Sequence, residues 1–190
     1  MSDFILEPTA TAQWQRLVRE AAGAATQELD EQLESYLVFV LLRFSQDISA
    51  GHRVLALDYM QGLLAQGHER ADRLREVGDH CLLFAGLFPQ RARRRRVSVG
   101  YYVDLGRSAY ARLSDLLSRT TAELFGELSR AFVPLTDVLR AMRELDGSLA
   151  LSPLEAMDLW ADTGSRQART TLSRYGSGRC MPVRGNDTRQ

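Results

Sequence analysis

Apolar residues recur every three or four positions along most of this chain, and this spacing limits how it can fold more than any other feature. In one segment Leu33, Leu37, Val40 and Phe44 follow it, which places them on one face of a helix. Sustained alternation of apolar and polar residues, which indicates a strand with one buried face, does not occur. The sequence therefore predicts an all-α protein.

Glycine and proline residues fall between the periodic segments and divide the chain into helices. We expect a single-domain helical bundle of six to eight helices over residues 1–175 and a disordered, Arg-containing tail over residues 176–190. Thr120–Glu123 and Ser152–Glu155 both have the form of a capping box, and Pro134 should kink or break its helix. The expected helices cover residues 11–25, 27–47, 52–66, 68–88, 98–118, 120–145, 153–162 and 166–175.

The longest stretch without Asp, Glu, Arg or His is the ten residues from Cys81 to Gln90. A membrane-spanning helix needs about 20 apolar residues, so we expect no contact with a membrane. The N-terminus has no basic region and carries Asp3 and Glu7, unlike a signal peptide. Two cysteines without a CxxC pair predict neither a disulfide framework nor a zinc finger. The expected location is the cytoplasm.

All 24 basic residues of the chain are Arg. The absence of Lys excludes Schiff-base chemistry and a P-loop. The net charge is zero, but charge is spread unevenly. Two blocks are acidic: residues 1–90 carry 7 Arg and 13 acidic residues, and residues 135–164 carry 2 Arg and 6 acidic residues. Two blocks are basic: residues 91–134 carry 9 Arg and 4 acidic residues, and residues 165–190 carry 6 Arg and 1 acidic residue. Such blocks can pair within the fold, pair between subunits or face an anionic partner.

Acidic and histidine side chains gather on the helix expected at residues 68–88. Such residues can form a metal site or an acid–base pair, yet neither Glu-x-x-His nor His-Glu-x-x-His occurs. The alternative, which we expect, is a solvated polar face with a surface pair between Glu76 and His80. No cofactor is predicted. The candidate metal or ligand residues are His68, Asp72, Glu76, Asp79 and His80, with Asp104 from the following helix.

Arginine residues cluster in two places. Guanidinium groups bind phosphate well, so both clusters are candidate anion- or partner-binding sites, and nucleic acid is the alternative partner. The segment from Ser152 to Tyr175 reads helix, turn, helix, but Trp160 stands where a helix-turn-helix needs a small residue. The net charge of zero is unlike that of a dedicated nucleic-acid binder. The candidates are Arg91, Arg93, Arg94, Arg95 and Arg96 in a loop, and Arg166, Arg169 and Arg174 near the C-terminus.

Small residues form a seam along the helix expected at residues 68–88, at spacings of three and four. A partner helix can approach such a seam closely. The segment from Tyr36 to Leu42 is apolar on every side, which predicts a central helix buried all round. We expect a homodimer that buries the seam, this segment or part of the helix at residues 98–118. The helix-packing seam comprises Ala71, Leu74, Gly78, Cys81, Ala85 and Phe88.

About a fifth of the chain resembles a family of uncharacterised bacterial all-helical proteins. The resemblance implies an all-α fold and transfers no activity or catalytic residue. It rests on Gly78-Asp79, Leu82-Leu83, Gly86, Phe88-Pro89, Tyr101-Tyr102, Gly106 and Ser108-Ala109-Tyr110.

The sequence favours a non-enzymatic cytoplasmic interaction or regulatory protein that forms a homodimer and binds a further protein. A nucleic-acid-associated protein that uses residues 91–96 and the Arg-rich C-terminus is the first alternative. A helical-bundle enzyme or small-ligand binder is the second.

Overall fold

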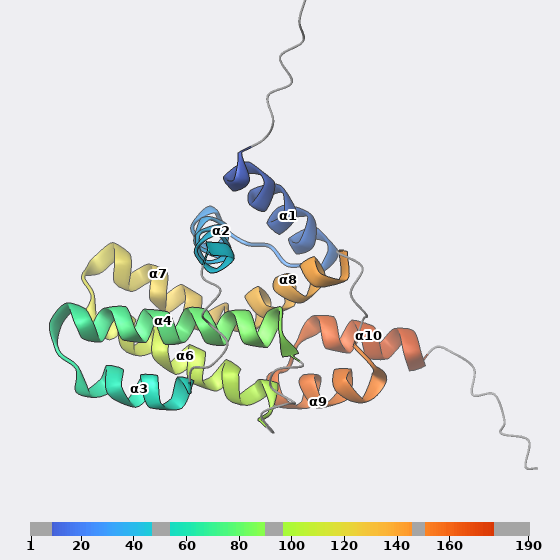
Figure 1. Cartoon of the computed structure of the whole chain (residues 1–190). Helices are drawn as coiled ribbons and strands as arrows, with labels where there is room; N and C mark the ends of the chain where they lie inside the picture. Colours follow the sequence, from blue (N-terminus) through green and yellow to red (C-terminus); the bar gives the residue numbers. More distant parts are fainter. Residues whose placement is uncertain (1–8, 47–53, 90–96, 146–150, 177–190) are drawn as a thin grey trace, which may run out of the picture.

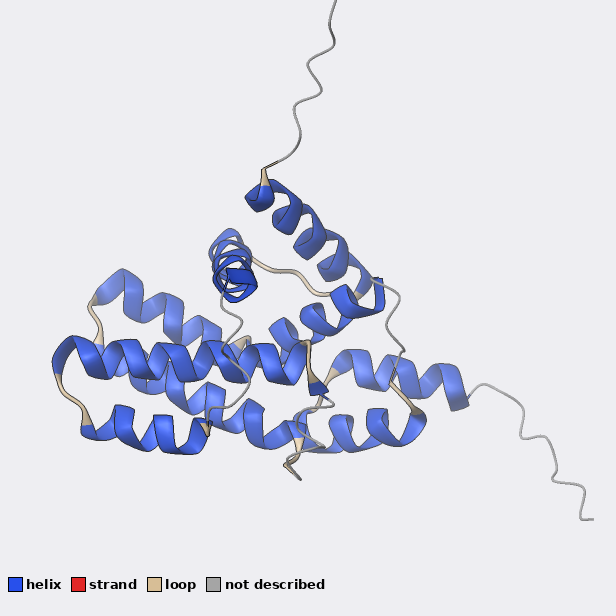
Figure 2. Cartoon of the chain, in the orientation of Figure 1, coloured by secondary structure: helices blue, strands red, loops and turns tan. Residues whose placement is uncertain are grey.

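The computed structural model describes residues 9–46, 54–89, 97–145 and 151–176. In these residues all regular secondary structure is helical (Figure 2), which confirms the predicted all-α fold. The described residues form nine helices, where six to eight were expected. They are α1 (Ala10–Ala24), α2 (Glu31–Gln46), α3 (Leu55–Leu64), α4 (Gly67–Gly86), α6 (Val99–Leu116), α7 (Arg119–Arg130), α8 (Phe132–Leu145), α9 (Pro153–Thr163) and α10 (Arg166–Gly176).

Proline explains the extra helix. We expected one helix over residues 120–145 with a kink or break, and the structure divides it at Ala131 into α7 and α8. Pro134 has no N–H to donate to the carbonyl of Arg130, and its ring would clash with that carbonyl. The chain therefore ends one helix at Arg130 and begins another in which Pro134 lies in the first turn, where no donor is needed.

Helix caps decide two other boundaries. The Asp30 carboxylate accepts a hydrogen bond from the N–H of Leu33 at 2.8 Å, so α2 begins at Glu31 rather than at Gln27. The capping box predicted at Thr120–Glu123 is wrong, because α7 already begins at Arg119 and Ser118, at its N-cap, makes no side-chain cap hydrogen bond. The box at Ser152–Glu155 is confirmed: both of its hydrogen bonds form at the start of α9.

Helix α4 is the central helix of the bundle. It lies between α3 and α7 in Figure 1 and packs against α3, α6 and α8. Residues 77–86 are buried without interruption, because neighbours cover every side of the C-terminal half of α4. Helix α2, expected in this role, is instead open to solvent at Phe39, which is about half exposed.

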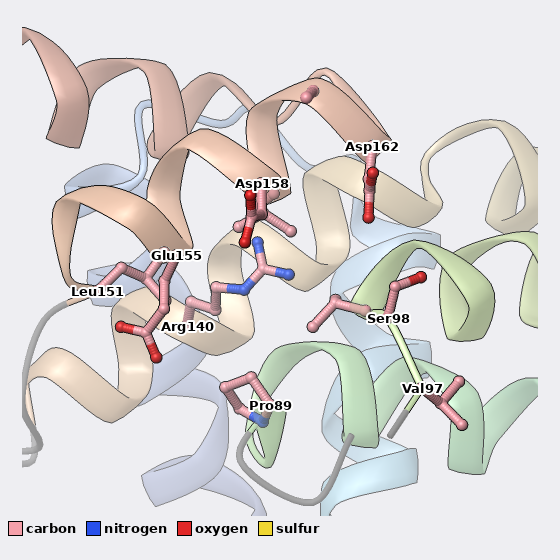
Figure 3. A pocket seen from close by; sticks show the side chains of 11 residues that line it. Pro89, Val97, Ser98, Arg140, Leu151, Glu155, Asp158 and Asp162 are labelled. Carbon is pink, nitrogen blue, oxygen red and sulfur yellow. The ribbon is translucent and has the colours of Figure 1, made fainter. Parts of the chain in front are cut away.

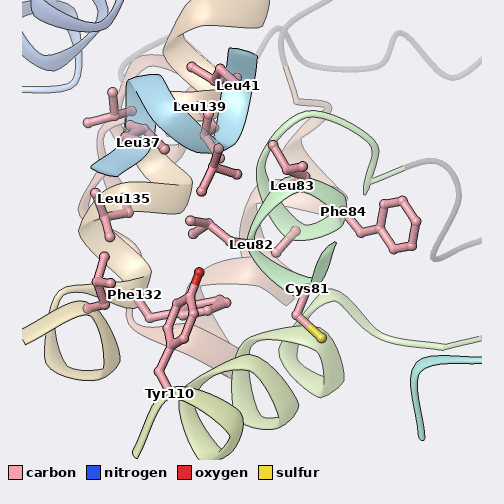
Figure 4. Packing of buried hydrophobic residues seen from close by; sticks show 14 of the residues in the cluster. Leu37, Leu41, Cys81, Leu82, Leu83, Phe84, Tyr110, Phe132, Leu135 and Leu139 are labelled. Carbon is pink, nitrogen blue, oxygen red and sulfur yellow. The ribbon is translucent and has the colours of Figure 1, made fainter. Parts of the chain in front are cut away.

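Two hydrophobic clusters hold the fold together. The main core joins α1 to α8, and Leu82, Tyr110, Phe132 and Leu139 are among its fully buried side chains (Figure 4). A smaller cluster joins α9 to α10 and reaches the main bundle through Val99 at the start of α6. In the parts of the chain that the structure describes, no helix is both long and apolar enough to cross a bilayer.

Candidate functional site

A buried polar cluster ties α2, α4 and α6 together around Asp79. Asp79 is 5% exposed, and its carboxylate accepts hydrogen bonds from the hydroxyl groups of Tyr36 at 2.7 Å and Tyr110 at 2.8 Å. Its second oxygen lies 3.3 Å from Nη1 of Arg43. A buried carboxylate needs such partners, because its charge is costly away from water. These contacts fix three helices to one point.

Burial dominates the ionisation of this cluster. It raises the pKa of Asp79, while the two tyrosine hydroxyls and then Arg43 oppose the rise. Burial, followed by the nearby charge of Asp79, also raises the pKa of Tyr36 and of Tyr110 well above the usual value. Beside the carboxylate lies a void of about 20 Å³, enough for one water molecule but not for a substrate. The cluster is therefore a structural tie between helices.

The candidate metal and ligand residues do not share one site. His68, Asp72 and Asp104 are exposed, whereas Asp79 and His80 are buried, contrary to the expectation of a solvated polar face. The predicted surface pair of Glu76 and His80 side chains is also wrong. His80 is buried and its Nδ1 lies 2.7 Å from the backbone carbonyl of Glu76. Among the described residues, no group of three or more His, Cys, Asp or Glu side chains could hold a metal ion.

The small-residue seam of α4 packs against neighbouring helices of the same chain. A Cβ atom at Gly78 would lie 2.3 Å from Cε1 of Tyr110 on α6, and the ring is fully buried. A Cβ atom at Gly106 on α6 would lie 2.8 Å from Cβ of Cys81. The seam therefore brings α4 and α6 into close contact within one chain. Gly78, Cys81 and Ala85 are buried there, so they leave no free surface for the dimer contact that we expected along the seam.

An apolar surface that no described part of the chain covers lies instead on α3. Its inner face packs on α4 through Leu55 and Gly62, both buried. Its outer side carries the α3 apolar face, whose members are strongly exposed. They are Val54 at 54%, Leu57 at 59%, Met60 at 55% and Leu64 at 79%.

The α9–α10 hairpin carries a second apolar stripe and a row of Arg residues. Leu154, Met157 and Trp160 of α9 are about half exposed or more. Trp160, which stands where a helix-turn-helix needs a small residue, is 47% exposed and does not fill the junction with α10. The fully buried Ala156 and Ala168 meet there instead, as small residues allow close packing.

The predicted Arg residues of α10 share one side of their helix. Arg166, Arg169 and Arg174 are exposed, and α10 contains no acidic residue. The other predicted arginines, Arg91 and Arg93 to Arg96, lie outside the described residues.

The structure contains a second buried polar cluster, on α8, that the sequence did not predict. Asp137 and Arg140 of α8 are 0% and 2% exposed, and their side chains lie 3.2 Å apart. They are spaced i, i+3 on a helix, which for most charged pairs indicates a surface contact. The burial of Asp137 and Arg140 results from the packing of α10 and the end of α4 over them, which the sequence alone does not show.

Comparisons with known proteins give no match. Searches against protein-family models, curated proteins and solved structures each found none.

Proposed function

We propose that this protein is a non-enzymatic interaction protein that forms a homodimer through the α3 apolar face. The observation that supports it is the composition of α3. From Leu55 to Leu64 the helix contains one charged residue, Asp58, and apolar side chains lie on both its inner and outer sides. A helix that is apolar all round is normally buried on every side, yet the described chain covers only the side facing α4.

The occupant of this surface is a second copy of the chain. In a twofold dimer the same surface of each copy meets its equivalent, so a suitable surface carries few charges. The outer side of α3 meets this requirement. The α9 stripe does not, because α9 also carries Glu155, Asp158 and Asp162 and no basic residue, and two copies would bring like charges together. The α9 stripe fits an unlike partner that presents apolar and basic side chains.

Sedimentation of matched variants tests this proposal. In the first variant Leu57, Met60 and Leu64 are replaced by Ser, and in the control Leu154, Met157 and Trp160 are replaced by Ser. At tens of micromolar the parent and the control should sediment as dimers. The α3 variant should sediment as a monomer with the helical content of the parent, because its replaced side chains lie outside the core. A monomeric parent, or an α3 variant that stays dimeric, contradicts the proposal.

The exposed Arg row of α10 favours nucleic-acid association as a second candidate function. Guanidinium groups that follow a phosphate backbone give affinity that falls steeply with salt. Replacing Arg166, Arg169 and Arg174 by Ser should then abolish retention on a duplex DNA column without changing the melting temperature. Retention that is equal for parent and variant rejects this candidate.

A further inference from the structure

The hairpin of α9 and α10 closes a cavity against the main bundle, and the function proposed above does not use it. The cavity has a volume of about 330 Å³, at the lower end of the range for small-molecule sites. Figure 3 shows it between the end of α4, the start of α6, α8 and α9. Its apolar wall comprises Pro89, Val97, Val99, Leu151, Leu159 and Ala161.

Arg140 supplies a buried cation to the cavity wall. Its Nη1 lies 3.2 Å from Asp137, and its Nη2 donates to the carbonyl of Ala85 at the end of α4, at 3.0 Å. Asp137 is itself held by the hydroxyl of Ser165 at 2.6 Å, so the guanidinium cannot swing away without breaking a network. Burial lowers the pKa of Arg140 to about 10, which leaves it charged at neutral pH.

The hydrogen bonds of Arg140 are incomplete. A guanidinium has five N–H donors, and the buried Nε of Arg140 has no hydrogen-bond partner. An unsatisfied buried donor is unfavourable, and a donor on a charged group favours an anionic acceptor. The side chain is 2% exposed and lines the cavity. A carboxylate bound in the cavity beside this guanidinium would supply the acceptor that it lacks.

Helix α9 supplies negative charge to the cavity, opposite in sign to Arg140. Glu155, Asp158 and Asp162 all line the same cavity, and in the view of Figure 3 Asp158 lies above the guanidinium of Arg140, with Glu155 to its left. Asp162 packs against Gly100 in the first turn of α6, where the helix dipole favours an anion. The carboxylate of Asp158 is exposed and forms no ion pair with any described residue. It is placed to receive an ammonium group.

We propose that this cavity binds a small zwitterion of the amino-acid class, with its carboxylate at Arg140, its ammonium at Asp158 and its apolar side chain against the apolar wall. A simple anion fits less well, because three carboxylates line the cavity. A simple cation fits less well, because it would leave the Nε–H of Arg140 without an acceptor and would lie beside a guanidinium. A zwitterion satisfies both charges at once, and the volume limits it to a single amino acid or a molecule of that size.

Calorimetric titration of the full chain with three related probes tests the assignment. The probes are L-leucine, 4-methylpentanoate, which lacks the ammonium group, and 3-methylbutylamine, which lacks the carboxylate. Each lost charge-assisted hydrogen bond should weaken binding by about ten- to a hundredfold. L-leucine should therefore bind more tightly than either of the other probes.

The variant Asp158→Asn tests the position of the ammonium group. Its control is Asp104→Asn, at an exposed residue of α6 outside the cavity. Asp158→Asn should weaken the binding of L-leucine by about tenfold or more. It should not weaken the binding of 4-methylpentanoate, because that probe has no ammonium group and loses a repelling carboxylate. Asp104→Asn should change neither. The proposal is overturned if L-leucine, L-valine and L-methionine all fail to bind at 10 mM, roughly the weak limit of millimolar recognition. It is also overturned if either single-charge probe binds as tightly as L-leucine. A third contradicting result is that Asp158→Asn weakens the binding of L-leucine and of 4-methylpentanoate equally.

Discussion

Replacing Gly78 by Ala should destabilise the protein strongly, although the change adds one methyl group. That group would lie 2.3 Å from Cε1 and 2.5 Å from Cδ1 of Tyr110, far inside van der Waals contact. The ring cannot retreat easily. It is fully buried, packs against the rings of Phe125 and Phe132, and is held by its hydroxyl to Asp79. Helices α4 and α6 must therefore separate, or the hydrogen bond of Tyr110 must lengthen.

The net cost can be estimated from three contributions. Overpacking a well-filled core costs about 1–3 kcal/mol. Weakening a hydrogen bond to a buried carboxylate costs about 1–2 kcal/mol more. Ala is the better helix former, which returns up to about 1 kcal/mol. We therefore expect the free energy of unfolding to fall by about 2–3 kcal/mol, of the order of the larger point-mutation effects.

Urea unfolding followed by circular dichroism measures this change, and Gly23→Ala is the matched control. Gly23 lies in α1, and a Cβ atom there would meet nothing within 4 Å. The same substitution should therefore leave stability unchanged or raise it by up to about 1 kcal/mol. Gly78→Ala should therefore lower the free energy of unfolding, and Gly23→Ala should not. A Gly78→Ala protein as stable as the parent would show that α4 and α6 do not approach as closely as described.

Two further predictions concern charged groups. Because burial raises the folded-state pKa of Asp79 above its ordinary value of 3.8, its contribution to stability is present below that value and is lost as pH rises through the folded pKa. The stability of the parent relative to Asp79→Asn should therefore fall in urea unfolding as the pH rises above the ordinary Asp pKa of 3.8, and a constant difference would contradict the assignment. If the basic and acidic blocks of the chain pair with one another, replacing Arg93 to Arg96 by Ser should lower the melting temperature or the dimer affinity, because acidic side chains then lose basic partners. An unchanged melting temperature with loss of tight, salt-sensitive duplex binding would favour nucleic acid instead.

Local sequence signals predicted most of the helices because each depends on residues close in the chain. The start of α9 at Ser152 and the break near Pro134 follow from a cap and from a missing N–H, both local properties. Errors arose where two signals competed. The residues from Gln27 to Asp30 continue the helical period. Asp30, however, is the N-cap of α2, so the residues up to and including Asp30 lie outside that helix.

The choice of central helix required tertiary information. The uncharged run from Cys81 to Gln90 was the strongest signal for a buried helix, and its first residues complete α4. Asp79 and His80, just before this run, looked like members of a polar face. Only the placement of Tyr36 and Tyr110 shows how a buried carboxylate is satisfied at that position.

The candidate surfaces were the least predictable part of the molecule. The pattern of Val54, Leu57, Met60 and Leu64 in the sequence is the same as that of a helix packed in a core, because spacing identifies a face but not what covers it. The charged groups around the cavity come from α8 and α9, and Arg140 became a candidate only when its partners at the end of α4 and the start of α10 were in place.

Hydrogen exchange over a concentration series tests the central proposal most directly, because it locates the dimer contact as well as detecting it. If two copies meet through the α3 apolar face, the amides of Leu55 to Leu64 should exchange more slowly as the protein concentration rises from below to above the dimer dissociation constant. The amides of α9 should show no such change. Exchange from α3 that is independent of concentration, or protection that appears in α9 instead, would contradict a dimer built on α3.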